Sequence, residues 1–241
     1  EAVKLTGKKG FGNLKGFVNG VLRSIARELP GIVCQDLWTR YSTPKWIVEQ
    51  WMEQYGEEKT LQMLAGQYKQ RPLTIRANLL KTTKEQLKER LQAEGVCVQE
   101  VDGTACALSI SDYDHLRAIP SFREGLFQVQ DVSSMQAALL AAPKAGDYCI
   151  DVCAAPGGKS LHLAELMRGT GFVEARDLTL EKVALIEENI ARMGTENIKA
   201  LQMDATILDE GSIQRADVVL ADLPCSGLGV LGKKRDLKYR I

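Results

Sequence analysis

The sequence lacks the features that would place the protein in a membrane or outside the cell. None of its apolar runs reaches the roughly 20 residues that a membrane-spanning helix requires, and no signal-peptide pattern is present. Its six cysteines are scattered and form no paired C-x-x-C sets of the kind that hold zinc. We therefore expect free thiols in a reducing cytoplasm, with no membrane partner and no metal.

An excess of charge of either sign is also lacking. The chain has 31 basic and 31 acidic residues, so its formal net charge is +0. Any nucleic-acid partner must therefore be bound by local basic patches. An apolar content of 45% over 241 residues is that of an ordinary globular protein with one large domain or two small ones.

The first segment, residues 1–30, is more basic than the chain as a whole. Apolar residues recur in it at helical spacing, from Phe17 to Ile25. This pattern fits two interpretations, a solvated helix face and an RNA-contacting surface.

Residues 31–125 predict a small α+β unit. Thr43 is expected to cap a helix with Pro44 at its first position and with Trp46 and Tyr55 on its apolar side. Residues 73–78 alternate as a strand does, and Thr83 begins a capping box. Two further strands flank the turn signal Asp102-Gly103. Four basic residues make this unit mildly basic: Lys69, Arg71, Arg76 and Lys81.

From residue 148 onward, apolar strand patterns alternate with helical ones. Such alternation is typical of a parallel sheet with helices on both of its faces. The expected strands are 148–153, 172–176, 198–203 and 217–222, and the expected helices between them are 159–168, 180–193 and 206–213.

The first of these strands runs into a glycine-rich turn, which reads DVCAAPGGKSLHLA from Asp151. Gly157 and Gly158 remove side chains where a ligand could approach the backbone. The helix that begins near Lys159 would point free N–H groups and its positive dipole end at that ligand. The turn matches neither a dinucleotide fingerprint nor a phosphate P-loop.

An aspartate stands at the end of each following strand: Asp177, Asp204 and Asp222. One such acid is commonplace, but three of them beside a glycine-rich turn indicate a shared ligand site at the carboxyl ends of the strands. Asp177 lies about twenty residues after the glycines, where an acid can accept hydrogen bonds from ribose hydroxyls. An acid for ribose without a phosphate signature favours S-adenosylmethionine, whose sulfonium cation tolerates an acidic cleft.

Two stretches resemble a known family. The segments CAAPGGK (153–159) and DLPCSGLG (222–229) closely resemble motifs of the RNA cytosine C5-methyltransferases, the Nol1/Nop2/Sun family. FVNGVLR (17–23) and ARDLT (175–179) are similar to its bacterial Sun/Fmu branch, which modifies 16S ribosomal RNA.

The resemblance covers nearly the whole chain and implies a fold. It is an α/β, Rossmann-like class I methyltransferase sheet that lacks its C-terminal strands, preceded by a small α+β RNA-binding subdomain and the tail of a NusB-like helical domain. The implied limits are 1–30 for the NusB-like end, 31–125 for the subdomain and 126–241 for the methyltransferase domain.

The resemblance also assigns the site. It implies that the turn binds the methionine end of S-adenosylmethionine, that Asp177 binds the ribose and that Asp204 binds the adenine edge. Asp222 would lie near the methyl group and the target base, as both a cofactor-binding and a catalytic residue. The implied cofactor-binding residues are Cys153, Ala154, Ala155, Pro156, Gly157, Gly158, Lys159, Asp177, Asp204 and Asp222.

Cys225 is a second candidate catalytic residue. From the residues alone it is the candidate nucleophile, because it lies in a Pro-Cys turn at a strand end beside the cofactor. The resemblance instead implies that this cysteine helps to release product and that the nucleophile belongs to a Thr-Cys pair on the next strand. No Thr-Cys pair follows Cys225, so we expect a parent protein that continues beyond Ile241, with this chain cut at both ends.

The sequence therefore predicts S-adenosylmethionine-dependent methylation of C5 of a cytosine in RNA, with 16S ribosomal RNA favoured as the substrate. Two alternatives stay open: a transfer-RNA methyltransferase, and a module that holds cofactor and RNA without turnover. We expect a monomer with no DNA partner.

Overall fold

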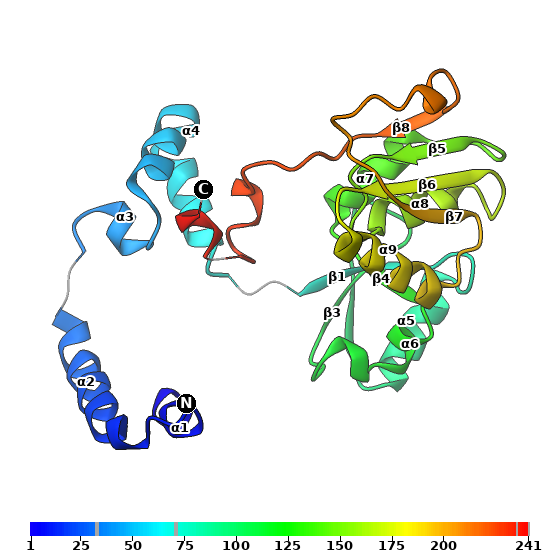
Figure 1. The fold of residues 1–241 in the computed structure, drawn as a ribbon. Helices are drawn as coiled ribbons and strands as arrows, with labels where there is room; N and C mark the ends of the chain where they lie inside the picture. Colours follow the sequence, from blue (N-terminus) through cyan, green and yellow to red (C-terminus); the bar gives the residue numbers. More distant parts are fainter. Residues whose placement is uncertain (32–33, 70–71, 235, 241) are drawn as a thin grey trace. The chain divides into compact units, whose positions relative to one another are not determined.

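The computed structural model describes residues 1–31, 34–69, 72–234 and 236–240 (Figure 1). Contacts within the chain divide it into two compact units. One comprises Glu1–Lys69 with Gly227–Ile241, and the other comprises Gln70–Ser226. The domain limits inferred from the sequence stay a prediction, because contact density and domain ancestry are different properties.

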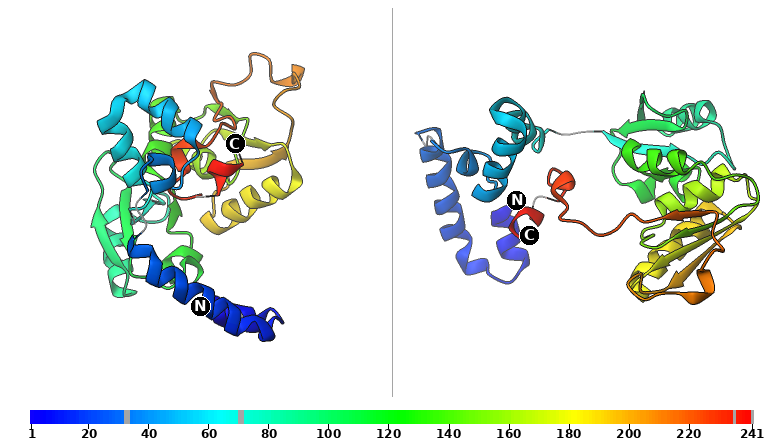
Figure 2. Two further views of the ribbon diagram at one scale, coloured as in Figure 1. Left: turned by 90° about the vertical axis from the view of Figure 1, so that its left-hand side faces the viewer. Right: turned by 90° about the horizontal axis from the view of Figure 1, so that it is seen from above.

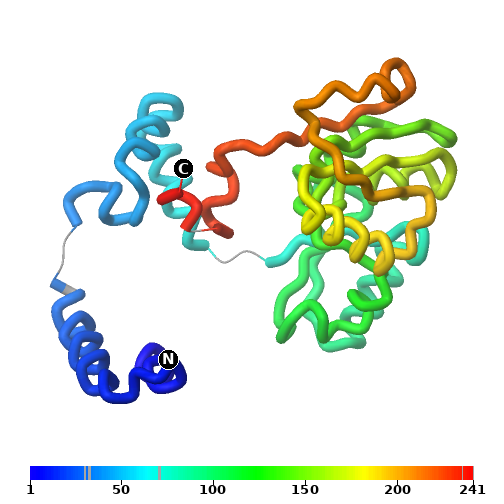
Figure 3. Tube along the Cα trace, in the orientation of Figure 1, coloured from blue at the N-terminus to red at the C-terminus, as the bar shows by residue number. Residues whose placement is uncertain are grey.

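The first unit is helical. Its helices are α1 (Ala2–Lys8), α2 (Lys15–Glu28), α3 (Leu37–Arg40) and α4 (Lys45–Gly66), with 3-10 turns η1 (Gly12–Leu14), η2 (Leu29–Gly31), η5 (Leu228–Val230) and η6 (Leu237–Tyr239). The C-terminal segment, red in Figure 3, packs beside α4, and Leu231 joins its core residues Ile47, Val48, Trp51 and Leu64. None of the described helices has the length and apolarity that crossing a bilayer requires.

Two expectations for α4 are wrong in detail. Pro44, not Thr43, occupies the N-cap, and the Thr43 hydroxyl donates to the Tyr41 carbonyl oxygen at 3.0 Å. Trp46 and Tyr55, expected on the apolar side, are exposed. The helix bends at Gly56, where φ is 75°, so one continuous apolar stripe does not extend along its length.

The second unit begins with a small antiparallel sheet in the order β2-β3-β1-β4. Its strands are β1 (Leu73–Ala77), β2 (Cys97–Glu100), β3 (Ala107–Ser111) and β4 (Phe127–Val129), covered by α5 (Lys84–Ala93), α6 (Pro120–Arg123) and η3 (Leu116–Ala118). The predicted capping box is confirmed, since the Thr83 hydroxyl and the Gln86 side chain each accept from the other residue's backbone N–H. The predicted strand, helix and hairpin are therefore confirmed.

The small sheet is less basic at its surface than the sequence suggested. Arg76 has no exposed surface and is paired with Glu165 in the following part of the unit. Arg71 lies outside the described residues. Arg76 therefore adds no charge to the surface, because both faces of β1 are covered at this point: Ile75 and Ala77 are fully buried as well.

The larger sheet is parallel, in the order β7-β6-β5-β8. Its strands are β5 (Tyr148–Asp151), β6 (Phe172–Asp177), β7 (Ile198–Gln202) and β8 (Val218–Leu220), and its helices are α7 (Val132–Ala141), α8 (Gly158–Leu166) and α9 (Leu180–Met193). In Figure 2 the alternating helices and strands of this sheet run from α7 in green to β8 in orange. The predicted α/β, Rossmann-like order of elements is confirmed.

The three helices lie on one face of this sheet. Alternate strand residues such as Cys149, Val173 and Ala200 share one apolar core with α7, α8 and α9. Because successive strand residues face opposite sides, Ile150 and Val219 belong to the other face. That face is crossed by residues 203–216, in which only η4 (Glu210–Ser212) is helical among the described residues.

The short helix expected near 206–213 is therefore reduced to η4, and the described residues place no α-helix on the second face of the sheet. Asp204 accepts a hydrogen bond from the Thr206 N–H at 2.9 Å, and such a local side-chain bond competes with the helical backbone pattern. Asp209 is the N-cap of η4 and accepts from the Gly211 N–H at 3.2 Å, so the helical turn begins only at Glu210.

The two sheets of this unit are joined at Gly125, which follows α6. The Asn78 side chain donates to the Gly125 and Met193 carbonyl oxygens at 2.9 and 3.0 Å. Gly125 has φ +70°, and a Cβ there would lie 1.9 Å from the Arg192 carbonyl oxygen. This position therefore needs glycine for both its conformation and the close approach of α9.

We predict that Gly125→Ala lowers the free energy of unfolding by roughly 3 kcal/mol or more, because strain and a backbone clash add. Gly146→Ala is the control, since Gly146 has φ +90° with nothing near its missing Cβ. It should cost about 1 kcal/mol, from backbone conformation alone. Urea unfolding measures both variants, and equal losses would contradict the crowding at Gly125.

Candidate cofactor site at the strand ends

The glycine-rich turn joins β5 to α8, as predicted. Gly157 is the N-cap of α8 with φ 100°, and no side chain caps the helix. The N–H groups of the first helical turn are therefore available to a ligand. A Cβ on Gly157 would lie 3.2 Å from Cγ2 of Ile186. Backbone conformation and packing against α9 thus account for this glycine, whereas the sequence argument invoked only the approach of a ligand.

Asp177 connects the glycine-rich turn to β6. It ends β6 and is 3% exposed. Its carboxylate accepts hydrogen bonds from the Ala155 N–H at 2.9 Å and the Leu178 N–H at 2.8 Å. Burial acts to raise the pKa of Asp177, but hydrogen bonds from Lys182 and these two N–H groups outweigh it and hold the pKa below its ordinary value.

Lys182 is the residue that the sequence argument missed. Its Nζ atom lies 2.9 Å from Oδ1 of Asp177, and it stands in the first turn of α9, which Thr179 caps. The sequence contained a signal for this contact: Lys182 follows the strand-end acid by five positions and comes just after the helix cap Thr179.

Asp222, two residues after β8, connects the glycine-rich turn to the end of that strand. It accepts a hydrogen bond from Nζ of Lys159 at 2.5 Å, and the Val152 N–H donates to the Leu220 carbonyl oxygen at 3.1 Å. The Asp222 side chain is 57% exposed, so this carboxylate faces solvent and remains accessible to a substrate. Cys225 follows three residues later with an exposed thiol.

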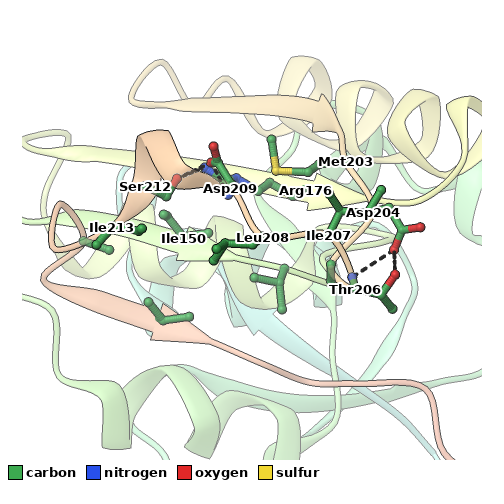
Figure 4. Close-up of a pocket in the computed structure, with 14 residues that line it drawn as sticks. Ile150, Arg176, Met203, Asp204, Thr206, Ile207, Leu208, Asp209, Ser212 and Ile213 are labelled. Carbon is green, nitrogen blue, oxygen red and sulfur yellow. Dashed lines mark hydrogen bonds and ion pairs between the residues drawn. The ribbon is translucent and has the colours of Figure 1, made fainter.

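A backbone hydrogen bond places Asp204 next to the end of β6. The Met203 N–H donates to the Asp177 carbonyl oxygen at 2.9 Å, which sets the end of β7 beside that of β6. The Asp204 carboxylate itself accepts from the Thr206 hydroxyl at 2.7 Å, and this bond is the main cause that lowers its pKa (Figure 4). The carboxylate of Asp204 therefore hydrogen-bonds within its own loop in this structure.

Asp204 also stands at the rim of a cavity of about 480 Å³ on the sheet face that lacks helices. Ile150, Ile207 and Val219 contribute apolar walls, and Arg176 lies with Asp209 elsewhere in the lining (Figure 4). Most of this cavity therefore lies along the sheet face, away from the glycine-rich turn.

The remaining turn residues have packing roles. Cys153 is half-buried, and burial, with Asp177 nearby, raises the pKa of its thiol, so it is a poor candidate for a thiolate. The Pro156 carbonyl oxygen accepts from the Asn189 side chain at 3.0 Å, and Ala154 donates to the Arg176 carbonyl oxygen at 2.9 Å. The structure thus gathers residues 153–159, Asp177 and Asp222 into one constellation.

Asp151 supports the turn from inside. It is 1% exposed and accepts hydrogen bonds from the Ser160 hydroxyl at 2.6 Å and the Cys153 N–H at 3.4 Å. Burial raises the pKa of Asp151 to about 6. Its ionised form is therefore disfavoured in the folded protein, and stability falls as the pH rises from about 4 through 6.

We predict that Asp151→Asn relieves this penalty. The amide oxygen can still accept from the Cys153 N–H, and the amide NH2 can donate to the Ser160 hydroxyl oxygen in place of the present contact. The free energy of unfolding of the wild type, minus that of the variant, should fall by about 2 kcal/mol between pH 4 and pH 7. Urea unfolding across this pH range measures the difference. A difference that does not change with pH would contradict the raised pKa.

Two family models match the chain. The model described as "16S rRNA methyltransferase RsmB/F" matches residues 138–241, and the ferredoxin-like domain of RsmF/B-like methyltransferases matches residues 43–113. The two matched segments contain the larger and most of the smaller sheet.

Curated relatives agree with these models. The chain is 37% identical, over 99% of its length, to the probable ribosomal RNA small subunit methyltransferase B of Bacillus subtilis, and covers 55% of that protein. It is 30% identical, over 86% of its length, to the 26S rRNA (cytosine-C(5))-methyltransferase nsun-1 of Caenorhabditis elegans, and covers 32% of it. The chain spans about half the length of the bacterial relatives that it matches.

Among solved structures, the crystal structure of PH0851 matches with a TM-score of 0.87 and 28% identity, over all of this chain and 55% of that one. A methyltransferase homologue from Pyrococcus horikoshii matches with a TM-score of 0.70 and 26% identity, over 84% of this chain and 66% of that one. With these matches, the two motifs and the sheet order, the chain belongs to the Nol1/Nop2/Sun family of RNA cytosine C5-methyltransferases, in its Sun/Fmu branch.

Proposed function

We propose that the chain supplies the cofactor-binding part and RNA-contacting surfaces of an enzyme that methylates C5 of a cytosine in RNA. S-adenosylmethionine is the methyl donor, and 16S ribosomal RNA is the favoured substrate. The observation that carries the proposal is the pair of side-chain contacts that join three strand ends, from Ala155 to Asp177 and from Lys159 to Asp222.

The residues fit this cofactor. A carboxylate has about four acceptor positions, and Asp177 uses three of them for Ala155, Leu178 and Lys182. A ribose hydroxyl can take the fourth, or can replace Lys182, whose side chain is 46% exposed. The uncapped start of α8 suits the carboxylate of the methionine end. Asp204 is the proposed acceptor for the adenine edge.

The cofactor supplies an electrophilic methyl group, and the protein must orient the base toward it. We assign this task to Asp222, whose exposed carboxylate can accept a hydrogen bond from the exocyclic amine of cytosine. Lys159 holds that carboxylate in place through an ion pair. The target base must be unpaired or extruded from its helix to reach this point.

RNA-contacting surfaces are proposed in two places. In residues 1–30, all of the basic side chains are exposed: Lys4, Lys8, Lys9, Lys15, Arg23 and Arg27. This exposure supports the interpretation of the segment as the RNA-binding end of a NusB-like domain. The small sheet within 31–125 is the second place, and residues 126–241 bind the cofactor. A cytoplasmic, monomeric protein without a DNA partner stays a prediction.

One relative favours a second candidate substrate. The chain is 41% identical over 127 residues to the tRNA (cytosine(72)-C(5))-methyltransferase of Pyrococcus horikoshii, across 52% of this chain and 32% of that one. Release of tritium from RNA labelled at C5 of cytosine compares the substrates and separates an enzyme from a module without turnover. Release from 16S ribosomal RNA by the intact protein, dependent on S-adenosylmethionine, is the expected result.

We predict that Asp177→Asn weakens binding of S-adenosylhomocysteine about 10- to 100-fold, because a charged acceptor is lost. Titration calorimetry measures the Kd. The control is Asp147→Asn, since Asp147 accepts from the Lys144 N–H just before β5, away from the carboxyl ends of the strands. Unchanged affinity in Asp177→Asn would refute the ribose assignment.

For Cys225→Ala we predict that cofactor affinity stays within about twofold of the wild type, whereas an RNA–protein adduct that resists detergent accumulates. The reason is that the Pro-Cys thiol is proposed to act in product release. Denaturing gels of the intact protein with RNA and S-adenosylmethionine detect the adduct. If the variant instead forms no adduct and releases no tritium, Cys225 is the nucleophile.

A further inference from the structure

Arg76 on β1 is a charged side chain in an unusual place. It has no exposed surface and is the largest fully buried side chain among the described residues. Arginine is seldom fully buried unless it is paired, because a guanidinium loses strong hydration there. Its partners therefore indicate what the burial achieves.

Two partners hold the guanidinium in unit Gln70–Ser226. Its Nη1 atom donates to Oε2 of Glu165 on α8, and its Nε atom donates to Oε1 of Gln130 at 2.7 Å. Gln130 directly follows β4, and its own N–H donates to the Thr74 carbonyl oxygen at 3.2 Å. Arg76 thus connects the small sheet to a helix of the methyltransferase sheet.

Gln130 in turn lies against the start of that helix. A Cβ placed on Gly158 would lie 3.8 Å from Cδ of Gln130, an ordinary packing distance. Gly158 is the first residue of α8 and follows the N-cap Gly157 of the glycine-rich turn. Arg76 therefore contacts α8 near its end, at Glu165, and reaches its first residue through Gln130.

A buried ion pair is rarely needed for stability alone. Replacing both partners with apolar residues of similar volume is often neutral or stabilising, whereas removing one partner is costly. Burial raises the pKa of Glu165, and the adjacent Arg76 guanidinium offsets part of that rise. Unlike an apolar contact, such a pair fixes the direction and distance between the two side chains.

We propose that Arg76 is a positioning residue that sets the place of the cofactor turn through Gln130 and Glu165. The inference rests on the proposed function, since it assumes that the turn binds S-adenosylmethionine. The Arg76 contacts hold the small sheet rigidly against the start of α8. The proposed RNA-contacting part and the cofactor-binding part therefore keep a fixed relative position.

The test measures the Tm and the Kd for S-adenosylhomocysteine of the intact protein and its variants. Arg76→Met alone should lower the Tm by about 10 °C, because Glu165 is left buried and unpaired. The double variant Arg76→Met/Glu165→Met should recover most of that Tm. Its Kd should nevertheless stay about tenfold weaker than that of the wild type, because Gln130 has lost the donor that orients it.

Two further variants make the test specific. Gln130→Met keeps the ion pair and should also weaken the Kd about tenfold, which provides a result if the double variant does not fold. Asn78→Leu is the matched destabilised control, because Asn78 joins the same strand region to the far end of α9 at Met193. It should lower the Tm with an unchanged Kd.

Recovery of both Tm and Kd in the double variant would overturn the inference and leave Arg76 a purely structural residue. A weaker Kd in Asn78→Leu that matches the loss in the double variant would also overturn it, since general destabilisation would then explain both. A wild-type protein that does not bind S-adenosylhomocysteine would instead refute the proposed function, and the inference with it.

Discussion

The hydrogen bond from the Ala155 N–H to the buried Asp177 carboxylate is the constraint on which the site depends. An ionised carboxylate that is 3% exposed is costly unless several donors surround it. The Ala155 N–H of the turn, the Leu178 N–H directly after β6 and Lys182 in the first turn of α9 supply those donors. The same contacts that stabilise Asp177 therefore fix the backbone of the turn and the direction of α8.

The rest of the unit reinforces this arrangement from two sides. The small sheet contacts α8 through Arg76 and contacts the end of α9 through Asn78. The first contact lies on the helix that follows the glycine-rich turn, whereas the second, at Met193, lies at the end of α9 that is far from the turn. Placing polar, directional contacts at these junctions favours a single arrangement of the two sheets, and the apolar cores supply the bulk of the stability.

The sequence was sufficient for features set by local patterns. Strand–helix alternation, the Thr83 capping box and the row of strand-end acids were predicted because each depends on a few neighbouring residues. The buried pairing of Arg76 with Glu165 was missed, since 89 residues separate the partners. The helix expected near 206–213 is reduced to η4, because Asp204 binds the Thr206 N–H of its own loop and Asp209 caps a turn that begins only at Glu210. Long-range pairing and local competition of this kind leave little trace in a single sequence.

The central claim is that the strand ends at Gly157, Asp177 and Asp222 form one cradle for a methyl-donating nucleoside. A crystal structure of the intact protein with S-adenosylhomocysteine tests it most directly. The account predicts ribose hydroxyls within hydrogen-bonding distance of the Asp177 carboxylate and the amino-acid end of the ligand at the start of α8. A ligand bound instead in the cavity against Ile150 and Val219, away from Asp177, would contradict it.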